Sequence, residues 1–324
     1  MRTITYGKAI GEAVHEEMTR DNAVIVLGED VGLMGNVFGL FKGFMEEFGS
    51  HRVIDTPISE AGFTGMAVGA AMRGIRPVVE LMYVDFAPIC FDPIANQAAK
   101  MRYMTGGQVS IPMVIRAPGG AGRRNAGQHS QSLETLFTHM PGLKVVSPAT
   151  PYDAKGLLKT AIRDNDPVIF LEHKLLYASK GEVPEEEYLI PLGKADVKRA
   201  GKDVTIITYS RQVLFALEAA KELEQQGIDA EVLDLRSLVP LDWEAIAASV
   251  RKTHRVVVVH EAIKRSGYGG EIAAQIMEEL FDELDAPVKR VAAENVVPPF
   301  SPPLEDAFFP GVKDIVAGVL DVVR

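Results

Sequence analysis

The chain has 324 residues, of which 47% are hydrophobic, and its formal net charge is −10. This length is enough for two domains with sizeable cores, and the dispersed basic residues argue against a nucleic-acid-binding surface, which needs a concentrated basic face. No apolar run approaches the roughly 18 residues of a membrane span and the N-terminus lacks a signal-peptide pattern, so we expect a soluble, cytoplasmic protein.

Short β-rich runs alternate with helical patterns over the first half of the chain. A helix over residues 5–19 precedes a strand at 24–27, and a helix that begins at Ser59 precedes a strand at 77–82. Continuous apolar strands, which a parallel sheet covered on both faces requires, follow at 113–115, 143–146 and 168–171. Residues 1–175 are therefore predicted to form a doubly wound, mostly parallel α/β domain.

A charged, proline-containing stretch over residues 176–203 interrupts this pattern and is predicted to be a linker. A second series follows, with strands at 204–207, 230–233 and 255–259 and a helix over 211–226 that ends at Gly227. We expect residues 204–324 to form a smaller α/β domain.

Glu60 is the leading candidate for a catalytic carboxylate. It lies at a predicted turn from strand to helix and is followed by small residues, which let a flat ligand approach closely. A carboxyl group in apolar surroundings gains proton affinity, which suits exchange of a proton with a bound heterocycle. The alternative is a helix-capping role, for which the neighbouring Ser59 is the better residue.

Other candidates follow neighbouring strands. Glu29 follows the first strand and would raise the proton affinity of the pair if it lay beside Glu60. Tyr83 and Phe86 follow another strand and could stack on a planar ring, or could be core residues. His129 lies near the end of the glycine-rich segment 119–132 and is the best acid–base histidine. The alternative is an ordinary loop histidine that bonds the backbone. The only cysteine, Cys90, lies in an apolar stretch and is expected to be buried and inert.

Several segments together resemble the beta subunit of thiamine-diphosphate-dependent 2-oxo acid dehydrogenases. The resemblance spans the chain and is carried by Gly28-Glu29-Asp30, Asp55-Thr56-Pro57-Ile58-Ser59-Glu60, Gln128-His129-Ser130-Gln131-Ser132, Pro141-Gly142-Leu143 and Asp234-Leu235-Arg236-Ser237-Leu238. It implies a pyrimidine-binding domain, followed by a C-terminal domain like that of transketolase that joins subunits. There is no Gly-x-Gly-x-x-Gly after a strand and no Walker-type phosphate loop, so nicotinamide-dependent dehydrogenation is disfavoured.

The resemblance assigns roles to these candidates. The residue matching Glu60 bonds the aminopyrimidine ring and promotes formation of the reactive ylid, and Glu29 supports it. Ile58, Met82 and Phe86 contact the cofactor, and His129 serves acyl transfer to lipoamide. Family members also hold a structural monovalent cation, commonly potassium, at positions that match Ile111, Ala161, Ile162, Asp164 and Asp166; taken alone, the 163–167 segment reads as a helix-ending turn.

The family's Gly-Asp-Gly segment, which holds the diphosphate and magnesium, is missing from this chain. The resemblance therefore implies an alpha subunit that brings magnesium and the diphosphate pocket, an alpha-2 beta-2 heterotetramer, and the lipoyl domain and core of a dihydrolipoyl acyltransferase as further partners. We expect a pyruvate or acetoin substrate. The alternatives are a branched-chain 2-oxo acid dehydrogenase, a non-catalytic scaffold subunit and a transketolase-like carboligase, although carboligase chains usually carry the diphosphate half themselves.

Overall fold

The computed structural model describes residues 1–323, which fall into two compact units. Residues 1–119 and 136–192 form the first unit, and residues 120–135 and 193–323 belong to the second. The domain boundaries predicted from the sequence at 175 and 204 stay a prediction. Segment 120–135, which carries His129, groups with the second unit although it lies between two strands of the first.

The first unit is built on a parallel sheet with the strand order β6, β7, β5, β4, β2, β3. The strands are β2 (Val24–Gly28), β3 (Val53–Asp55), β4 (Arg76–Glu80), β5 (Val114–Gly119), β6 (Lys144–Val146) and β7 (Val168–His173). Every residue of β5 and β7 is buried, as expected for strands covered on both faces. A separate antiparallel pair joins β1 (Arg2–Thr5) to β8 (Lys180–Val183), which lies in the predicted linker.

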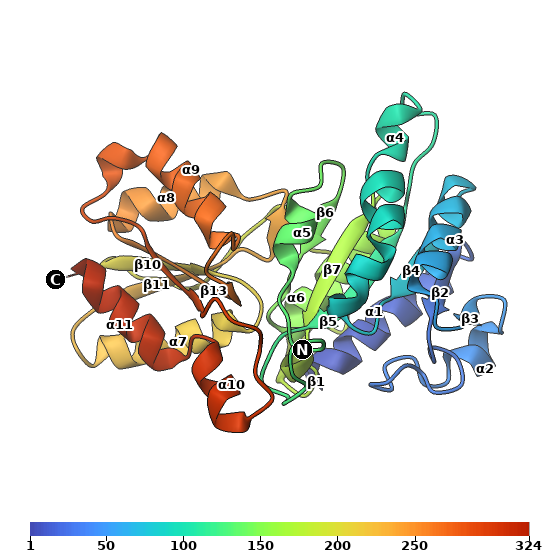
Figure 1. Cartoon of the computed structure of the whole chain (residues 1–324), viewed down its shortest axis with the longest axis horizontal. Helices are drawn as coiled ribbons and strands as arrows, with labels where there is room; N and C mark the ends of the chain where they lie inside the picture. The colour runs from blue at the N-terminus through green and yellow to red at the C-terminus, as the bar shows by residue number, and fades with distance from the viewer. Residues whose placement is uncertain (324) are drawn as a thin grey trace. The chain divides into compact units, whose positions relative to one another are not determined.

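Helices cover this sheet (Figure 1). Helix α1 packs against α6, and α3 packs against the short segments η1 and η2. Two of these helices have side-chain N-caps, because Thr5 accepts from the backbone N–H of Lys8 and Thr150 from that of Asp153. The helical elements are α1 (Tyr6–Arg20), α2 (Phe44–Phe48), α3 (Glu60–Met72), η1 (Val84–Cys90), η2 (Pro93–Ala98), α4 (Met101–Met104), α5 (Glu134–Thr138), α6 (Pro151–Arg163) and η3 (Lys174–Leu176).

The second unit holds a sheet with the order β14, β13, β10, β11, β9, in which only β9 is antiparallel. Helices lie on both faces of this sheet, α7 and α11 on one and α8 and α9 on the other (Figure 1). The elements are β9 (Asp196–Arg199), β10 (Val204–Thr208), α7 (Gln212–Glu224), β11 (Ala230–Asp234), β12 (Ser237–Val239), α8 (Trp243–Thr253), β13 (Val256–Ile263), α9 (Gly269–Glu279), η4 (Phe281–Glu283), β14 (Lys289–Ala293), α10 (Pro302–Phe308) and α11 (Val312–Val323).

The two doubly wound, mostly parallel sheets confirm the fold class predicted from the alternation of apolar strands and helical patterns. In such sheets, side chains that follow neighbouring strands meet at the carboxyl edge, where ligands bind. Among residues 1–323, the structure shows no helix long and apolar enough to cross a bilayer.

Candidate functional site

Glu60 is the first residue of α3, and the loop that precedes the helix follows β3. Its side chain is buried, with 7% exposed. The backbone N–H of Thr56 donates to the carbonyl of Gly28 at 3.0 Å, which ties this loop to the end of β2. Ser59 occupies the N-cap position without a side-chain capping bond, and Glu60 lies in the first turn of the helix, so the alternative of a structural carboxylate at a helix start is not tested. The β3–α3 turn therefore places a buried carboxyl at the carboxyl edge of the sheet.

Glu29 follows β2 and lies close enough to Glu60 for their charges to interact. Burial raises the pKa of Glu29, and repulsion from Glu60 and Asp30 raises it further. Its Oε1 atom is buried and has no hydrogen-bond partner among the described residues, and the same is true of Oγ1 of Thr56. Orphaned buried polar atoms beside a pair of carboxyls are what a polar ligand would satisfy.

The Cys90 thiol lies close to the same carboxyl. The thiol is fully buried, and burial, with a further contribution from Glu60, raises its pKa to about 11. Its burial confirms the prediction of a buried cysteine, and the raised pKa agrees with the expected lack of reactivity, which stays a prediction.

The other predicted cofactor contacts are Ile58, which precedes Glu60 in the chain, and Met82 and Phe86, which follow it. They differ in exposure. Met82 follows β4 and Phe86 lies in η1, and both are half-buried. Ile58, by contrast, is 84% exposed. The outer face of α3 is also open: Met66 is 50% exposed, and a Cβ atom added at Gly65 or Gly69 would meet nothing within 4 Å. Apolar groups beside the Glu60 carboxyl are thus left uncovered by this chain's first unit.

A buried ion network beneath the sheet edge was missed by the sequence reasoning. Arg116 on β5 donates at 2.6 Å to Glu80 on β4, and at 2.7 and 2.8 Å to Glu172 on β7. All three side chains are buried. Asn36 donates to Glu80 and the Tyr177 hydroxyl donates to Glu172, each at 2.7 Å. The signal in the sequence was a charged residue within or at the end of an apolar run in each of these three strands.

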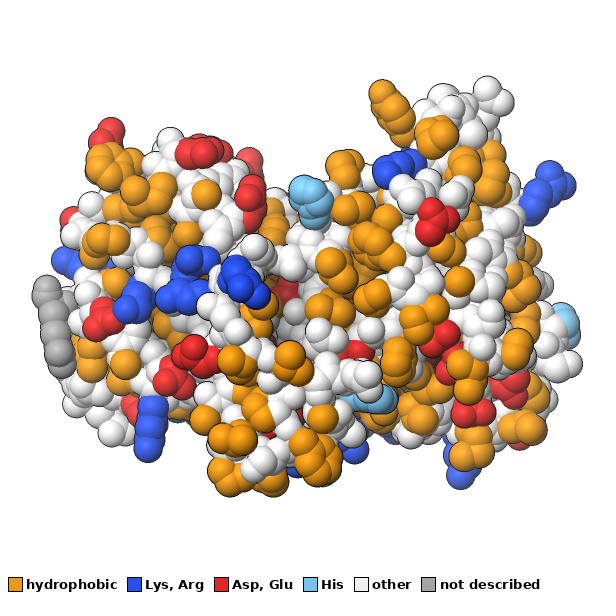
Figure 2. Space-filling model, in the orientation of Figure 1, with side chains coloured by type: hydrophobic (Ala, Val, Ile, Leu, Met, Phe, Trp, Pro, Cys, Tyr) orange, Lys and Arg blue, Asp and Glu red, His pale blue; other side chains and the backbone are white. Residues whose placement is uncertain are grey.

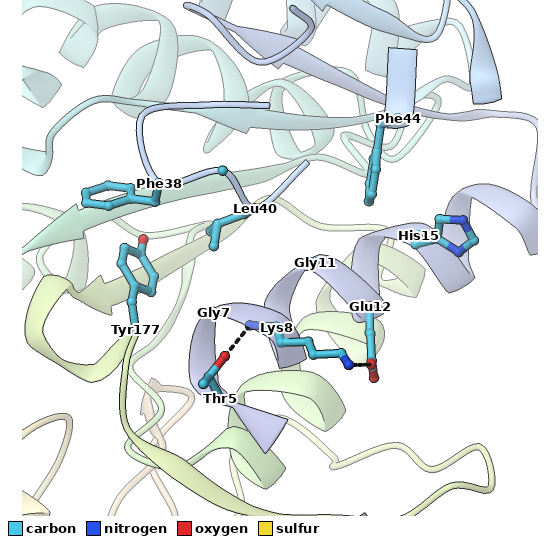
Figure 3. A pocket seen from close by; sticks show the side chains of 11 residues that line it. Thr5, Gly7, Lys8, Gly11, Glu12, His15, Phe38, Leu40, Phe44 and Tyr177 are labelled. Atoms are coloured by element: carbon cyan, nitrogen blue, oxygen red, sulfur yellow. Dashed lines mark hydrogen bonds and ion pairs between the residues drawn. The ribbon is translucent and has the colours of Figure 1, made fainter. Parts of the chain in front are cut away.

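This network holds the loop that follows Glu29. The amide oxygen of Asn36 accepts from the backbone N–H groups of Phe38 and Leu40, so the loop is tied through Asn36 to Glu80. Phe41 lies beneath the Arg116 guanidinium, 4.9 Å from its carbon to the ring centre. A cavity of about 470 Å³ lies between this loop and α1 (Figure 3). None of the sequence-predicted site residues lines the cavity.

The residues predicted to hold a monovalent cation lie at the end of α6 and before β5. Arg76 donates at 2.9 Å to the backbone oxygens of both Ile162 and Asp164. Lys144 bonds both carboxylate oxygens of Asp164, at 2.8 and 2.7 Å. Fixed side-chain cations thus already bond oxygens of this segment, so the structure offers no support for a cation there, and the site stays a prediction. No cluster of three or more His, Cys, Asp or Glu side chains suited to a metal ion occurs among residues 1–323.

His129 lies in the second unit and is described within it. It is half-buried in the loop between β5 and α5, and its backbone N–H donates to the carbonyl of Ala126 at 3.3 Å. Glu261 and Glu305 accept hydrogen bonds from the backbone of the same loop. The structure therefore gathers Glu29 and Glu60 in one unit and places His129 on a held loop in the other.

Comparisons with known proteins agree with this two-part organisation. The family "Transketolase, pyrimidine binding domain" matches residues 2–180, and "Transketolase, C-terminal domain" matches residues 193–315. The acetoin:2,6-dichlorophenolindophenol oxidoreductase subunit beta of Bacillus subtilis (strain 168) is 51% identical, covering 99% of this chain and 98% of the relative. The pyruvate dehydrogenase E1 component subunit beta of Porphyra purpurea is also 51% identical, over 98% and 96% of the two chains.

A solved structure shares the architecture. The chain named "Split gene transketolase, inactive beta4 tetramer" superposes with a TM-score of 0.82 at 26% identity, covering 99% of this chain and 98% of that one.

Proposed function

We propose, from the premise that this chain belongs to the family of transketolase-related dehydrogenase beta subunits, that it is the beta subunit of a thiamine-diphosphate-dependent dehydrogenase for acetoin or pyruvate. With an alpha subunit it cleaves the substrate and passes the acetyl group to lipoamide on a partner acyltransferase. The working unit is an alpha-2 beta-2 heterotetramer.

The observation that carries this proposal is the buried carboxyl of Glu60 beside the orphaned Oε1 of Glu29. The residues fit a polar heterocycle, because two buried acceptor atoms, on Glu29 and Thr56, lack partners next to an acid that could hold a proton. Thiamine diphosphate, when bound, supplies an electron sink. Glu60 would hold or release a proton at its carboxyl oxygen, and burial keeps bulk water from competing for that proton.

The other predicted cofactor-binding residues would position the cofactor and shield it from water. Glu29 has a raised pKa, so it shares a proton with Glu60 more readily than an exposed acid would. Phe86 and Met82 would pack against the flat face of the pyrimidine, and Ile58 would contribute a backbone contact. Arg116, between Glu80 and Glu172, keeps the ends of three strands in register and so fixes the edge on which these groups stand.

Two features support a second polypeptide. The chain carries no Gly-Asp-Gly segment for magnesium and diphosphate. Its first unit also exposes large apolar side chains, including Ile58 at 84%, Ile89 at 57% and Tyr103 at 90%. Figure 2 shows such side chains gathered at the end of this unit that carries α4. Exposed apolar groups on the unit that carries Glu60 favour a partner that covers them, and we assign the magnesium and diphosphate pocket to that partner.

Reconstitution with the alpha subunit tests this proposal. Glu60→Gln keeps the size of the side chain and removes the titrating carboxyl, so turnover should fall by about 10²- to 10⁴-fold, the usual contribution of a general acid–base group. The assay follows thiamine-diphosphate-dependent reduction of 2,6-dichlorophenolindophenol with acetoin, pyruvate or a branched 2-oxo acid. Glu46→Gln, at an exposed position on α2, is the matched control and should leave turnover unchanged.

The outcomes separate the rival functions. Unchanged turnover in Glu60→Gln would leave this chain a scaffold subunit. Preference for a branched substrate would replace the acetoin or pyruvate assignment. Ketol transfer between sugars without any need for lipoamide or a dye would indicate a transketolase-like carboligase.

A further inference from the structure

The loop that carries His129 is held by buried acidic side chains of the second unit. Glu305 on α10 is fully buried, and its Oε1 accepts from the backbone N–H of Gly122 at 2.9 Å. Its Oε2 accepts from the backbone N–H of Arg124 at 3.1 Å and from the Arg124 guanidinium at 2.7 Å. One carboxylate thus binds three donors from a three-residue stretch just before His129.

Two further contacts hold the same loop. Glu261, near the end of β13, accepts from the backbone N–H of Ala121 at 2.7 Å. Tyr209, directly after β10, donates its hydroxyl to Glu134 at the far end of the loop. Strands β10 and β13 are parallel neighbours, and the chain leaves β10 toward β11 on the other side. The crevice at such a switch point is where open α/β sheets bind ligands, and here loop residues 120–134 are held by groups that stand at it.

The conformation that Glu305 holds is strained. Arg124 and Ala126 have φ values of +59° and +58°, in the left-handed region that is unfavourable for a residue with a Cβ atom. A loop in this state needs fixed partners to stay in one conformation. Charge-assisted hydrogen bonds to backbone N–H groups are strong enough to provide them, because the acceptor is ionised and shielded from water.

We propose that Glu305 is a positioning residue for His129: by binding the backbone of Gly122 and Arg124 it sets the loop conformation that presents His129 to the acyl acceptor. This inference rests on the proposed function and concerns only the transfer of the acyl group to lipoamide. Cleavage of the substrate, which depends on Glu60, does not require it.

Asp306 provides a control that separates the ion pair to Arg124 from the bonds to the loop backbone. Asp306, the next residue, pairs with the same guanidinium at 2.8 Å, but its side chain is 58% exposed, and the backbone N–H groups of Gly122 and Arg124 bond Glu305 instead. Asp306→Asn therefore weakens an ion pair of Arg124 and leaves the backbone contacts in place. Glu305→Gln removes the negative charge of the carboxylate that accepts all three hydrogen bonds.

The experiment uses the reconstituted complex with two acceptors. Reduction of 2,6-dichlorophenolindophenol reports substrate cleavage, and acetylation of free lipoamide reports transfer. Glu305→Gln should lower the kcat for lipoamide by about 10- to 100-fold, the scale of a misplaced catalytic group, with dye reduction unchanged. Asp306→Asn should change neither rate. Glu305→Asp, which keeps the charge one methylene shorter, should restore part of the lipoamide rate.

Hydrogen exchange of residues 120–129 accompanies the kinetics, with faster exchange expected in Glu305→Gln. Equal loss with both acceptors, or no loss with lipoamide, would overturn the positioning role. If Glu305→Gln does not fold, Glu305→Asp carries the test, and a lipoamide rate equal to wild type together with unchanged exchange would overturn the proposal. Absence of both activities from the wild-type complex would instead overturn the proposed function.

Discussion

The candidate groups of the two units are held in place by different means. Glu60 is the first residue of a thirteen-residue helix, which a four-residue turn joins to strand β3, so regular secondary structure fixes its backbone. His129 stands in an irregular loop whose backbone is bonded by the side chains of Glu261 and Glu305. In the first unit the backbone hydrogen bonds of a strand and a helix fix the position of Glu60. In the second unit the loop that carries His129 lacks such regular bonds, and buried carboxylates bond its backbone instead.

This difference indicates which of the two regions tolerates substitution of distant side chains and which does not. A residue at a strand–helix turn keeps its place when distant side chains change, because its position depends on many backbone hydrogen bonds. A residue on a loop held by a few carboxylates loses its place when one of them is removed. Substitutions in the two regions should therefore separate cleavage from transfer, and they should differ in how they change stability.

His129→Asn should show the largest selective effect. If His129 serves acyl transfer, the variant should lose about 10²- to 10⁴-fold in turnover with lipoamide and keep its rate with 2,6-dichlorophenolindophenol. His139→Asn changes an exposed histidine shortly after the loop and should affect neither rate. Parallel loss with both acceptors in His129→Asn would mean that His129 takes part in cleavage, and the comparison of the two regions would fail.

Arg116→Met tests the network beneath the sheet edge of the first unit. Removing the guanidinium leaves Glu80 and Glu172 buried without their counter-charge, so the variant should be destabilised by about 3–5 kcal/mol. Thermal and urea unfolding followed by circular dichroism measure this loss. Lys289→Met breaks a pair with Asp321 in which the two side chains are 40% and 57% exposed, and should cost about 1 kcal/mol or less. Similar losses in the two variants would show that the network contributes no more than a surface pair.

Much of the fold followed from the sequence because its strands are continuous apolar runs. The runs at 113–115, 143–146 and 168–171 became β5, β6 and β7, and the helix expected to begin at Ser59 begins at Glu60. The resemblance also led to the correct family. The identification of Cys90 as a buried thiol depended only on its apolar neighbours, which is why it could be made locally.

The contacts that hold the site could not be read in this way. Glu305 lies about 180 residues from Arg124 in the sequence, and no local sequence pattern predicts that a carboxylate will bond the backbone of so distant a segment. Arg116 was passed over because a single charge in an apolar strand is informative only when its partners in neighbouring strands are known. The roles of Glu60, His129, Glu29, Ile58, Met82 and Phe86 came from resemblance and stay predictions until measured.

Glu29→Gln should reveal a smaller, pH-dependent effect in the first unit. The folded protein holds the proton of Glu29 more tightly than the unfolded chain does, since its pKa is raised above the ordinary 4.5. Stability from this group is therefore complete below pH 4.5 and is lost as pH rises through the folded pKa. The neutral glutamine escapes that loss, so the melting temperature of Glu29→Gln relative to wild type should increase between pH 4.5 and pH 8. Glu46→Gln should show no such trend, and a flat difference for Glu29→Gln would contradict the raised pKa of Glu29, which comes first from burial and then from repulsion by Glu60 and Asp30.

Ala126→Gly should have the smallest effect, in the second unit. The left-handed conformation of Ala126 costs about 1 kcal/mol or more, and glycine removes this cost while adding about 0.4–1 kcal/mol of unfolded-state entropy. The second term offsets much of the first, so stability should stay the same or rise by about 1 kcal/mol or less. Ala121→Gly, at a buried alanine that packs with Ala293 and Phe308, should instead lower stability. A clear loss of stability in Ala126→Gly would show that Ala126 is not strained.

Glycine at position 126 also gives the loop before His129 more conformational freedom. The lipoamide rate of Ala126→Gly should therefore fall slightly while dye reduction stays constant.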